Sequence, residues 1–481
     1  MSLTSALSSA MSGLGAASRG SEIVSNNISN ANTPGYARRT LEISSNGTGT
    51  GTGVRIDGIV RHVDQQVLND RRLAEAEYGY RSDTTAALTE IEDLVGTPDT
   101  QGSLSARLAD FEQSLITAAS RPDASERLNS AAYAAKDLVA SVNSVSDGIQ
   151  DIRTRADNSI AAQVNRLNDA LKGVQKLNSQ ITASNARNSD VSALQDERQR
   201  LIDEISEIVP ARVIERDHGQ VALYSTGGAI LLEGRAVEIE FEQTNVVTPY
   251  ASIDDGTLSG LTIDGFAINT TSGTGRLHGG TLGAQFEIRD EIAPAAQAEI
   301  DAFARDLIER FEDPSIDPSL TVGDPGLFTD NGASLVPTAD QGLASRLELN
   351  ALVDPSETAE TWRLRDGLGA AAPGNEGDAT LLTALNSALA DSRISGSGTV
   401  AHTAQSFIAG LTSQLGADRL REEQFLSFAS AQFTQLTEME LANGVDTDVE
   451  IQNLMILEQA YAANAKVIET VDEMLDALLR I

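Results

Sequence analysis

Both ends of the chain repeat apolar or small residues at alternating spacings of four and three, the spacing of a coiled-coil seam. The N-terminal run is Leu3, Leu7, Ala10, Leu14, Ala17, Ser21, Val24 and Ile28. The C-terminal run is Ile456, Ala460, Ala463, Val467, Val471, Met474, Leu478 and Ile481, widened by Leu454, Leu457, Tyr461, Leu475 and Leu479. Either stripe could belong to an ordinary amphipathic helix of its own domain. Two such stripes at opposite ends of one chain favour a model in which the terminal helices pack on each other.

The N-terminal stripe is a weak helix former by itself. Gly13, Gly15 and Gly20 lie within it, and each glycine costs about 1 kcal/mol relative to alanine in a helix interior. Short helices are marginal in water without a packing partner. We therefore expect this helix to form only against another one.

The paired helices are expected to run antiparallel, because both leave the same body of the chain. Their lengths, at 1.5 Å per residue, are comparable. This predicts that Leu3 and Leu7 lie near Leu478 and Ile481, and that Val24 lies near Ile456.

The region between the termini is predicted to be a helical body interrupted by a β-rich insert. Helical spacing runs through 104–115, 138–152 and 167–181, and Ser192 with Gln195 indicates a capping box. Alternation with period two replaces it in "AVEIEFEQ" and "LTIDGFAI", and "VALYSTGGAILLEG" is typical of a hairpin turning at its two glycines. The predicted class is mainly α with a β-rich insert, and with paired terminal helices forming a coiled-coil-like inner domain. The expected divisions are 1–60 (N-terminal half of the inner domain and joint), 61–210 (first part of the body), 211–283 (outer β domain), 284–440 (second part of the body, with an irregular connection over 313–345) and 441–481 (C-terminal half of the inner domain).

Charge and composition exclude several classes of partner and site. The 481 residues carry a net charge of −35 and no cysteine. Such a surface repels nucleic acid and anionic membranes, and disulfides, thiolate metal sites and cysteine nucleophiles are impossible. No cleavable signal peptide or run of 18 apolar residues is visible, so neither cleavage nor a membrane span is expected. Because copies of this chain repel each other, any self-assembly must rest on apolar contacts.

No catalytic, cofactor or metal site is expected. The glycine-rich stretch 47–53 precedes a strand-like segment, whereas a phosphate-binding loop needs a helix behind it. Adjacent acids could serve a glycosidase, but they arise by chance in a chain with 70 acidic residues. The acids considered are Asp254, Asp255 and Asp264. The histidines, which share no metal-binding spacing, are His62, His218, His278 and His402.

The segment "NNISNANTPGYARR", residues 26–39, joins the N-terminal helix to the rest of the chain. Proline followed by glycine in Thr33–Tyr36 predicts a type II turn, so the helix should end near Asn30. The asparagines can bond exposed backbone groups at the helix end, and their amides also suit lateral contacts in a hydrated interface. The joint residues singled out are Asn26, Asn27, Asn30, Asn32, Pro34, Gly35 and Tyr36.

This segment resembles the N-terminal signature of the bacterial flagellar axial proteins, which include rod, hook and hook-associated proteins. "NLMILEQAYAANAKVIETVDEMLDALL", residues 453–479, is similar to their C-terminal signature. "LQDERQRLIDEISEIV", "LHGGTLGAQFEIRDEI" and "WRLRDG" resemble the hook-associated members found at the hook–filament junction. The resemblance covers nearly the whole chain and is weakest over 211–275.

The resemblance implies a structural subunit without cofactor, exported uncleaved by the flagellar type III apparatus and assembled as a short ring in the extracellular flagellum. Its implied partners are itself, the hook protein, a second junction protein, the flagellin filament, and an export chaperone at the C-terminal helix; nucleic acid and membrane are not expected. The alternatives are a hook or other axial structural protein, or a secreted enzyme or adhesin carried on axial-type termini. The implied assembly residues are Leu3, Leu7, Leu14, Val24 and Ile28 in the N-terminal helix and Ile456, Tyr461, Val467, Val471, Met474, Leu478, Leu479 and Ile481 in the C-terminal helix, together with the joint.

Overall fold

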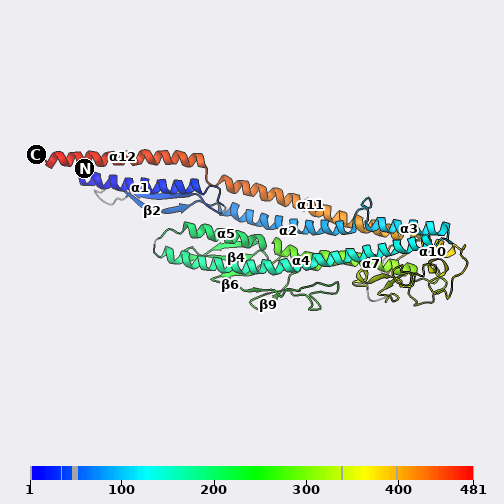
Figure 1. Cartoon of the computed structure of the whole chain (residues 1–481). Coiled ribbons are helices and arrows are strands. Elements are labelled where there is room, and N and C mark those ends of the chain that lie inside the picture. The colour runs from blue at the N-terminus through cyan, green and yellow to red at the C-terminus, as the bar shows by residue number, and fades with distance from the viewer. Residues whose placement is uncertain are drawn as a thin grey trace.

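Long helices lie along one axis of the molecule, and both ends of the chain lie at the same end of it (Figure 1). The computed structural model describes residues 3–33, 35–45, 53–187, 189–336, 340–396 and 399–479. Within these ranges helices dominate and strands are confined to short sheets. The predicted class, mainly α with a β-rich insert, is confirmed.

The helices differ widely in length. They are α1 (Leu3–Ser29), α2 (Gln65–Val95), α3 (Leu104–Ser120), α4 (Ser125–Asn185), α5 (Ser192–Ile208), α6 (Gly280–Glu287), α7 (Ala293–Phe311), α8 (Leu343–Arg346), α9 (Arg363–Asp366), α10 (Thr380–Ala390), α11 (Ala404–Ala442) and α12 (Thr447–Leu479). A 3₁₀ turn, η1 (Asp217–Gly219), and a π-helical turn, η2 (Ile288–Ile292), complete them.

The strands form four small antiparallel sheets. They are β1 (Arg39–Ser45), β2 (Val54–Arg61), β3 (Ala211–Glu215), β4 (Val221–Ser225), β5 (Ile230–Glu233), β6 (Arg235–Ala236), β7 (Ile239–Glu240), β8 (Leu261–Ile263), β9 (Phe266–Ile268), β10 (Phe328–Asp330) and β11 (Leu347–Leu349). The sheet orders are β1-β2, β3-β4-β5-β6, β7-β8-β9 and β10-β11.

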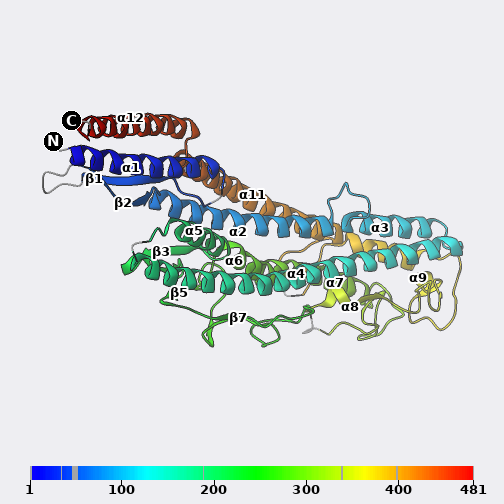
Figure 2. The same cartoon turned by 60° about the vertical axis from the view of Figure 1, so that its left-hand side comes forward.

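Two helix pairs follow one another along the upper side of the molecule (Figures 1 and 2). α1 and α12 form the first pair, and α2 and α11 form the second. In the second pair the rings of Tyr78 and Phe433 stack with centroids 5.6 Å apart, and Arg81 donates to Glu422 over 2.9 Å. The β1–β2 hairpin lies against α1, where Val54 N donates to Ser12 Oγ over 3.1 Å.

The body contains two main hydrophobic cores that share α4. The first combines the first half of α4 with α3, α7, α10 and the start of α11. At its centre Phe111, Phe311 and Phe328 pack with ring centroids 5.2–6.2 Å apart. The second core combines the second half of α4 with α5, α6 and the inward residues of the insert, including Leu223 and Leu231. The insert is therefore packed into the body along one face, and the proposed domain division stays a prediction.

Two local predictions in this region are wrong. "AVEIEFEQ" was expected to be one strand, but β6 and β7 belong to different sheets. Ile239 pairs with Ile263 of β8, and its backbone nitrogen and oxygen bond to the side chain of Asn168 in α4, at 3.0 and 2.7 Å, so that Ile239 does not extend the sheet of β6. The capping box is also absent: Ser192 Oγ donates to Asp190 over 2.7 Å, so the serine does not cap the helix.

The predicted hairpin at Gly227–Gly228 is confirmed, because β4 and β5 pair antiparallel and Gly228 has a φ of 87°. Most of the glycine-rich stretch 47–53 lies outside the described residues.

Candidate assembly site

The first and last helices of the chain pack on each other in opposite directions, as predicted. A methyl group added at Gly13 would lie 2.8 Å from the Asn464 side chain, and one added at Gly20 would lie 3.0 Å from Leu457. A step of seven residues forward along α1, from Gly13 to Gly20, thus corresponds to seven residues backward along α12, from Asn464 to Leu457, so the helices are antiparallel. The two glycines permit this close approach, which explains their presence in a helix interior. At Gly15 an added methyl group would meet nothing within 4 Å, so the contact does not explain that glycine.

The predicted register is wrong by up to about two turns at the start of α1, whereas Val24 lies within about one turn of its predicted neighbour, Ile456. Because the helices meet at Gly13–Asn464 and rise equally per residue, Leu7 lies level with Thr470 and not with Leu478. α12 continues past the start of α1, as Figure 1 shows. Ile481, the predicted neighbour of Leu3, lies outside the described residues. The buried joint described below, where Asn27 contacts Glu450, sets the register of the two helices. The comparable lengths of the helices do not determine it.

The face of α12 that covers α1 contains only part of the predicted stripe. Val471 is buried, and Leu454, Leu457, Asn464 and Ile468 are half-buried. The other predicted residues are largely exposed: Ile456 63%, Tyr461 45%, Val467 42%, Met474 49%, Leu478 59% and Leu479 85%. The prediction that these residues pack on α1 of the same chain is wrong. α12 carries two apolar faces, and the surface of small residues on α1 covers only one of them.

On α1 the residues that become buried are mostly small. Ala10, Ala16, Ala17, Gly20, Ile23, Val24 and Asn27 are buried. Of the predicted seam, Ala10, Ala17 and Val24 are buried, while Leu3, Leu7, Leu14, Ser21 and Ile28 are half-buried. A half-buried leucine row along a paired helix leaves apolar surface that a further partner can cover.

Asn27 is the centre of the joint between the terminal helices and the body. Its side chain is fully buried, and its amide nitrogen donates to Arg39 O over 2.8 Å and to Glu450 Oε2 over 3.1 Å. Its amide oxygen accepts from Tyr36 OH over 2.8 Å and from Arg39 N over 3.0 Å. One asparagine thus holds α1, β1 and α12 together, which no aliphatic residue could do in a buried position.

Two carboxylates complete the joint. Glu450 is 1% exposed and accepts from Arg38 Nε over 2.7 Å. Asp196 of α5 pairs with Arg39, and it accepts from Arg61 Nε over 2.6 Å. The first pair ties the chain after α1 to the start of α12, and the second ties the β1–β2 hairpin to the body. Removing one member of such a pair would leave an uncompensated charge in a shielded position.

The predicted turn is confirmed on its described residues. Tyr36 N donates to Thr33 O over 3.1 Å, and Gly35 has a φ of 77°, as the third position of a type II turn requires. Pro34 itself lies outside the described residues. The turn aims Tyr36 back at Asn27, and burial raises the pKa of the Tyr36 hydroxyl, against the opposing charge of Arg39.

The remaining asparagines have different roles. Asn30 caps the helix end, donating to Asn26 O over 2.9 Å and accepting from Thr33 Oγ1 over 3.3 Å. The side chains of Asn26 and Asn32 are exposed. Their role in contacts with other molecules stays a prediction.

A second charged cluster lies where α2, α5 and α11 meet. Arg71 pairs with Asp203 and Glu440, each over 2.7 Å, and Arg72 pairs with Asp203 over the same distance. Arg72 is 2% exposed. Burial raises the pKa of Glu440, and the positive charge of Arg71 opposes that rise. The cluster fixes the body directly beneath the joint.

Sequence reasoning missed most partners in this joint. Arg38 and Arg39 belong to the quoted motif, but their carboxylate partners, Glu450 and Asp196, lie 412 and 157 positions away among 70 acids. No local spacing singles them out.

Two further observations concern the described part of the chain only. No cluster of three or more histidine, cysteine, aspartate or glutamate side chains there could hold a metal ion. None of its helices is both long and apolar enough to cross a membrane.

Comparison with known families matches both ends and the middle of the chain. A family model described as the flagellar hook-associated protein FlgK helical domain matches residues 88–314. The model for the C-terminal part of the flagellar basal body rod FlgEFG proteins matches 441–481, and the flagella basal body rod protein model matches 7–36. The chain is therefore similar to flagellar hook-associated proteins over much of its helical body and to flagellar rod proteins at both ends. The two terminal matches fall on α1 with its turn and on α12.

Curated relatives agree with this similarity. The flagellar hook-associated protein 1 of Escherichia coli is 27% identical over 284 residues, covering 56% of this chain and 51% of that protein. The Salmonella typhimurium protein of the same name is 29% identical over 240 residues, covering 48% and 43%. The chain thus spans about half the length of these relatives. The Bacillus subtilis protein of the same name is 23% identical over 489 residues, covering 94% and 93%.

The flagellar hook junction protein FlgK from Burkholderia pseudomallei aligns with a TM-score of 0.45 and 17% identity, covering 54% of this chain and 46% of that chain. The similarity to hook-associated proteins is carried by the sequence matches.

Proposed function

We propose that this chain is a structural subunit of the bacterial flagellum that joins the hook to the filament. It is exported uncleaved through the flagellar type III apparatus and assembles through its terminal helices into a short ring. The observation that carries this proposal is the uncovered apolar face of α12, on which Ile456, Leu478 and Leu479 are 63%, 59% and 85% exposed. In an acidic chain such a face needs an apolar partner.

The assembly surface has three parts in this proposal. The half-buried leucines of α1 and the exposed face of α12 contact other copies, and the joint around Asn27 holds each helix pair at one fixed angle to its body. The division into an inner helix pair, a body and an outer β region follows the same logic. The partners are further copies of this chain, the hook protein, a second junction protein and the flagellin filament, with an export chaperone on the C-terminal helix before assembly.

The proposed role is structural and involves no catalysis or cofactor. Its matched family is one of structural flagellar proteins. A secreted enzyme or adhesin carried on the same termini would need a clustered acid or metal constellation in its insert. The inward-facing residues of the insert instead pack in the second hydrophobic core of the body.

Gold-labelled antibody against the purified chain tests the location. Electron micrographs of isolated flagella should show label confined to a short zone between hook and filament. Label along the whole hook would favour the hook-protein alternative, and label absent from intact flagella would contradict the proposal.

A further inference from the structure

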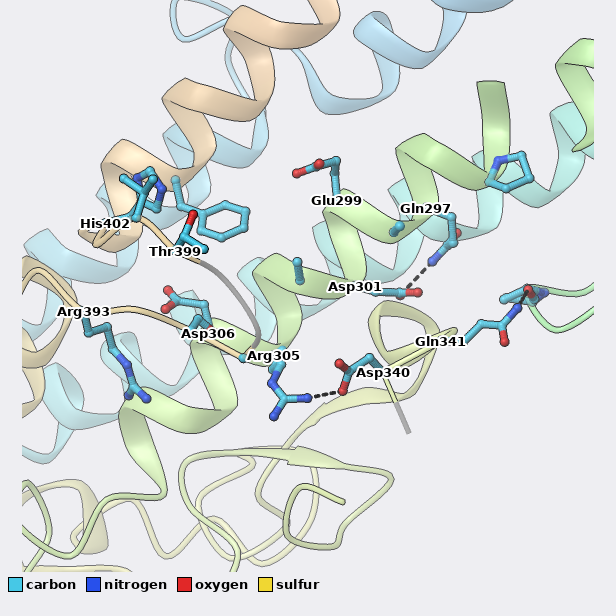
Figure 3. A pocket seen from close by; sticks show the side chains of 18 of the residues that line it. Gln297, Glu299, Asp301, Arg305, Asp306, Asp340, Gln341, Arg393, Thr399 and His402 are labelled. Atoms are coloured by element: carbon cyan, nitrogen blue, oxygen red, sulfur yellow. Dashed lines mark hydrogen bonds and ion pairs between the residues drawn. The ribbon is translucent and has the colours of Figure 1, made fainter. Parts of the chain in front are cut away.

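The cavity beside α7 is held together by bonds within the chain, as Figure 3 shows. Gln297 donates to Asp301 over 2.8 Å, and Arg305 pairs with Asp340. These side chains are therefore already bonded to one another across the cavity wall. The outer surface of the insert is different, because it carries a groove with unpaired groups.

This groove, of about 950 Å³, lies between two sheets of the insert. Ile230 of β5 lines it from one sheet, and the edge strand β9 lines it from the other. Val237 and Ile263 also line the groove, and both pack against the second core. Ile230 is 50% exposed and Phe266 of β9 is 78% exposed. Large apolar side chains exposed beside a groove are typical of a binding surface.

The outer edge of β9 carries backbone groups that its own sheet does not use. β9 is the last strand of the β7-β8-β9 sheet, and it pairs with β8 in the register Ile263↔Phe266 and Thr262↔Ala267. The two-residue turn between the strands is closed by the hydrogen-bonded pair of Ile263 and Phe266, so the next pair is not hydrogen-bonded. The N–H and C=O groups of Ala267 therefore point away from β8, and no other backbone group in the described part of the chain bonds to them. Such an edge can accept a further strand.

One positive charge in the lining of the groove has no acidic partner. Arg235 pairs with Asp264 over 2.9 Å, and Glu233 pairs with Arg216 over 3.0 Å. Arg276 is exposed, and none of the acids that the structure describes pairs with it. The groove therefore favours a negatively charged group, although the chain as a whole carries a net charge of −35.

We propose that this groove binds an extended segment of another polypeptide as a further strand on β9. The segment pairs with the backbone of Ala267, its β-branched side chains cover Phe266 and Ile230, and its carboxylate reaches Arg276. The backbone of Arg276 is fixed beside the β4–β5 turn, because its carbonyl oxygen accepts from Ser225 Oγ over 2.6 Å. The partner is thus an acidic, strand-forming peptide, and its binding is separate from the contacts of the terminal helices.

Fluorescence anisotropy with the full chain tests this with two labelled probes. One is a capped pentapeptide of glutamate, valine, threonine, valine and glutamate, and in the other probe lysines replace both glutamates. The acidic probe should bind saturably at physiological salt, at least tenfold more tightly than the lysine probe. Non-specific attraction to a chain of net charge −35 would give the opposite order.

Two variants and a control locate the binding. Ala267→Pro removes the outward N–H without removing a bond between β8 and β9, so affinity for the acidic probe should fall at least tenfold. Arg276→Gln removes the unpaired charge and should weaken the acidic probe at least threefold. Arg212→Gln, at an exposed arginine on β3 of the same insert, is the matched control and should leave affinity within twofold of wild type.

A further variant guards against misfolding of the proline variant. Phe266→Ser changes a side chain that is 78% exposed, so the circular dichroism spectrum should stay unchanged while affinity falls at least fivefold. Absence of saturable binding of the acidic probe, equal affinity for the two probes, or wild-type affinity in Phe266→Ser would overturn the proposal. Dimerisation of the chain alone that Phe266→Ser abolishes would also overturn it, because the groove would then hold a second copy.

Discussion

Replacing Asn27 by aspartate should open the joint between the terminal helices and the body. The change is nearly isosteric, so packing is kept while chemistry changes. The new side chain has no amide donor for Arg39 O or Glu450 Oε2, which the native nitrogen reaches over 2.8 and 3.1 Å. It also places a second carboxylate against that of Glu450.

The size of the effect follows from this geometry. Two like charges 3.1 Å apart repel by about 5 kcal/mol at an effective dielectric constant near 20. The variant can avoid this by taking up a proton, which costs about 4 kcal/mol at pH 7 for a carboxyl of ordinary pKa near 3.9, and about 1.5 kcal/mol at pH 5. The new carboxyl binds a proton more tightly in the closed joint than in the open one. The free-energy cost of closing the joint in the variant should therefore grow as pH rises above about 4.

Hydrogen exchange read by mass spectrometry measures this penalty locally. Peptides covering β1 and the first turns of α12 should exchange about a thousandfold faster in Asn27→Asp than in wild type at pH 7, after correction for intrinsic rates, and about tenfold faster at pH 5. Asn26→Asp is the matched control, because the side chain of Asn26 is exposed and such changes stay within about 0.5 kcal/mol. Equal protection in Asn27→Asp and wild type at pH 7 would refute the reasoning.

Three further predictions concern the helix pair. Leu478→Asp should leave export and body folding intact but abolish filament attachment, because its exposed side chain is needed between copies; normal swimming on soft agar would argue against that role. Gly15→Ala should stabilise α1 by about 1 kcal/mol, whereas Gly20→Val should weaken the pair, because a side chain at Gly20 meets Leu457 of α12 and one at Gly15 meets nothing within 4 Å. Amide exchange in α1 that changes in the same direction in both variants would contradict the packing. Cysteines at Gly13 and Asn464 should form a disulfide within one chain under mild oxidation, and failure to cross-link would show that the register is wrong.

The terminal pairing and the turn could be predicted from the sequence because their signals are local. A heptad spacing at each end and a proline–glycine turn near Asn30 are short-range patterns with a direct physical meaning. The direction of packing followed from both helices leaving one body. The structure confirms that direction, as the Gly13–Asn464 and Gly20–Leu457 approaches show.

The register and the buried face of α12 could not be predicted in this way. Periodicity shows that α12 is apolar on two sides, but only the steric fit to the small residues of α1 selects Leu457 over Ile456. The bond between Asn27 and Glu450 joins residues 423 positions apart, and no spacing rule reaches that far. Alternation in "AVEIEFEQ" likewise gave no sign that Asn168 of a distant helix would bond to the backbone of Ile239, or that the segment would divide between two sheets.

The most direct test of the proposed junction role is electron microscopy of cells in which the gene for this chain is deleted. We predict hooks of normal length without filaments, flagellin released into the medium, and filaments restored by the wild-type chain but not by Leu478→Asp. Deletion cells that still carry filaments on their hooks would contradict the account.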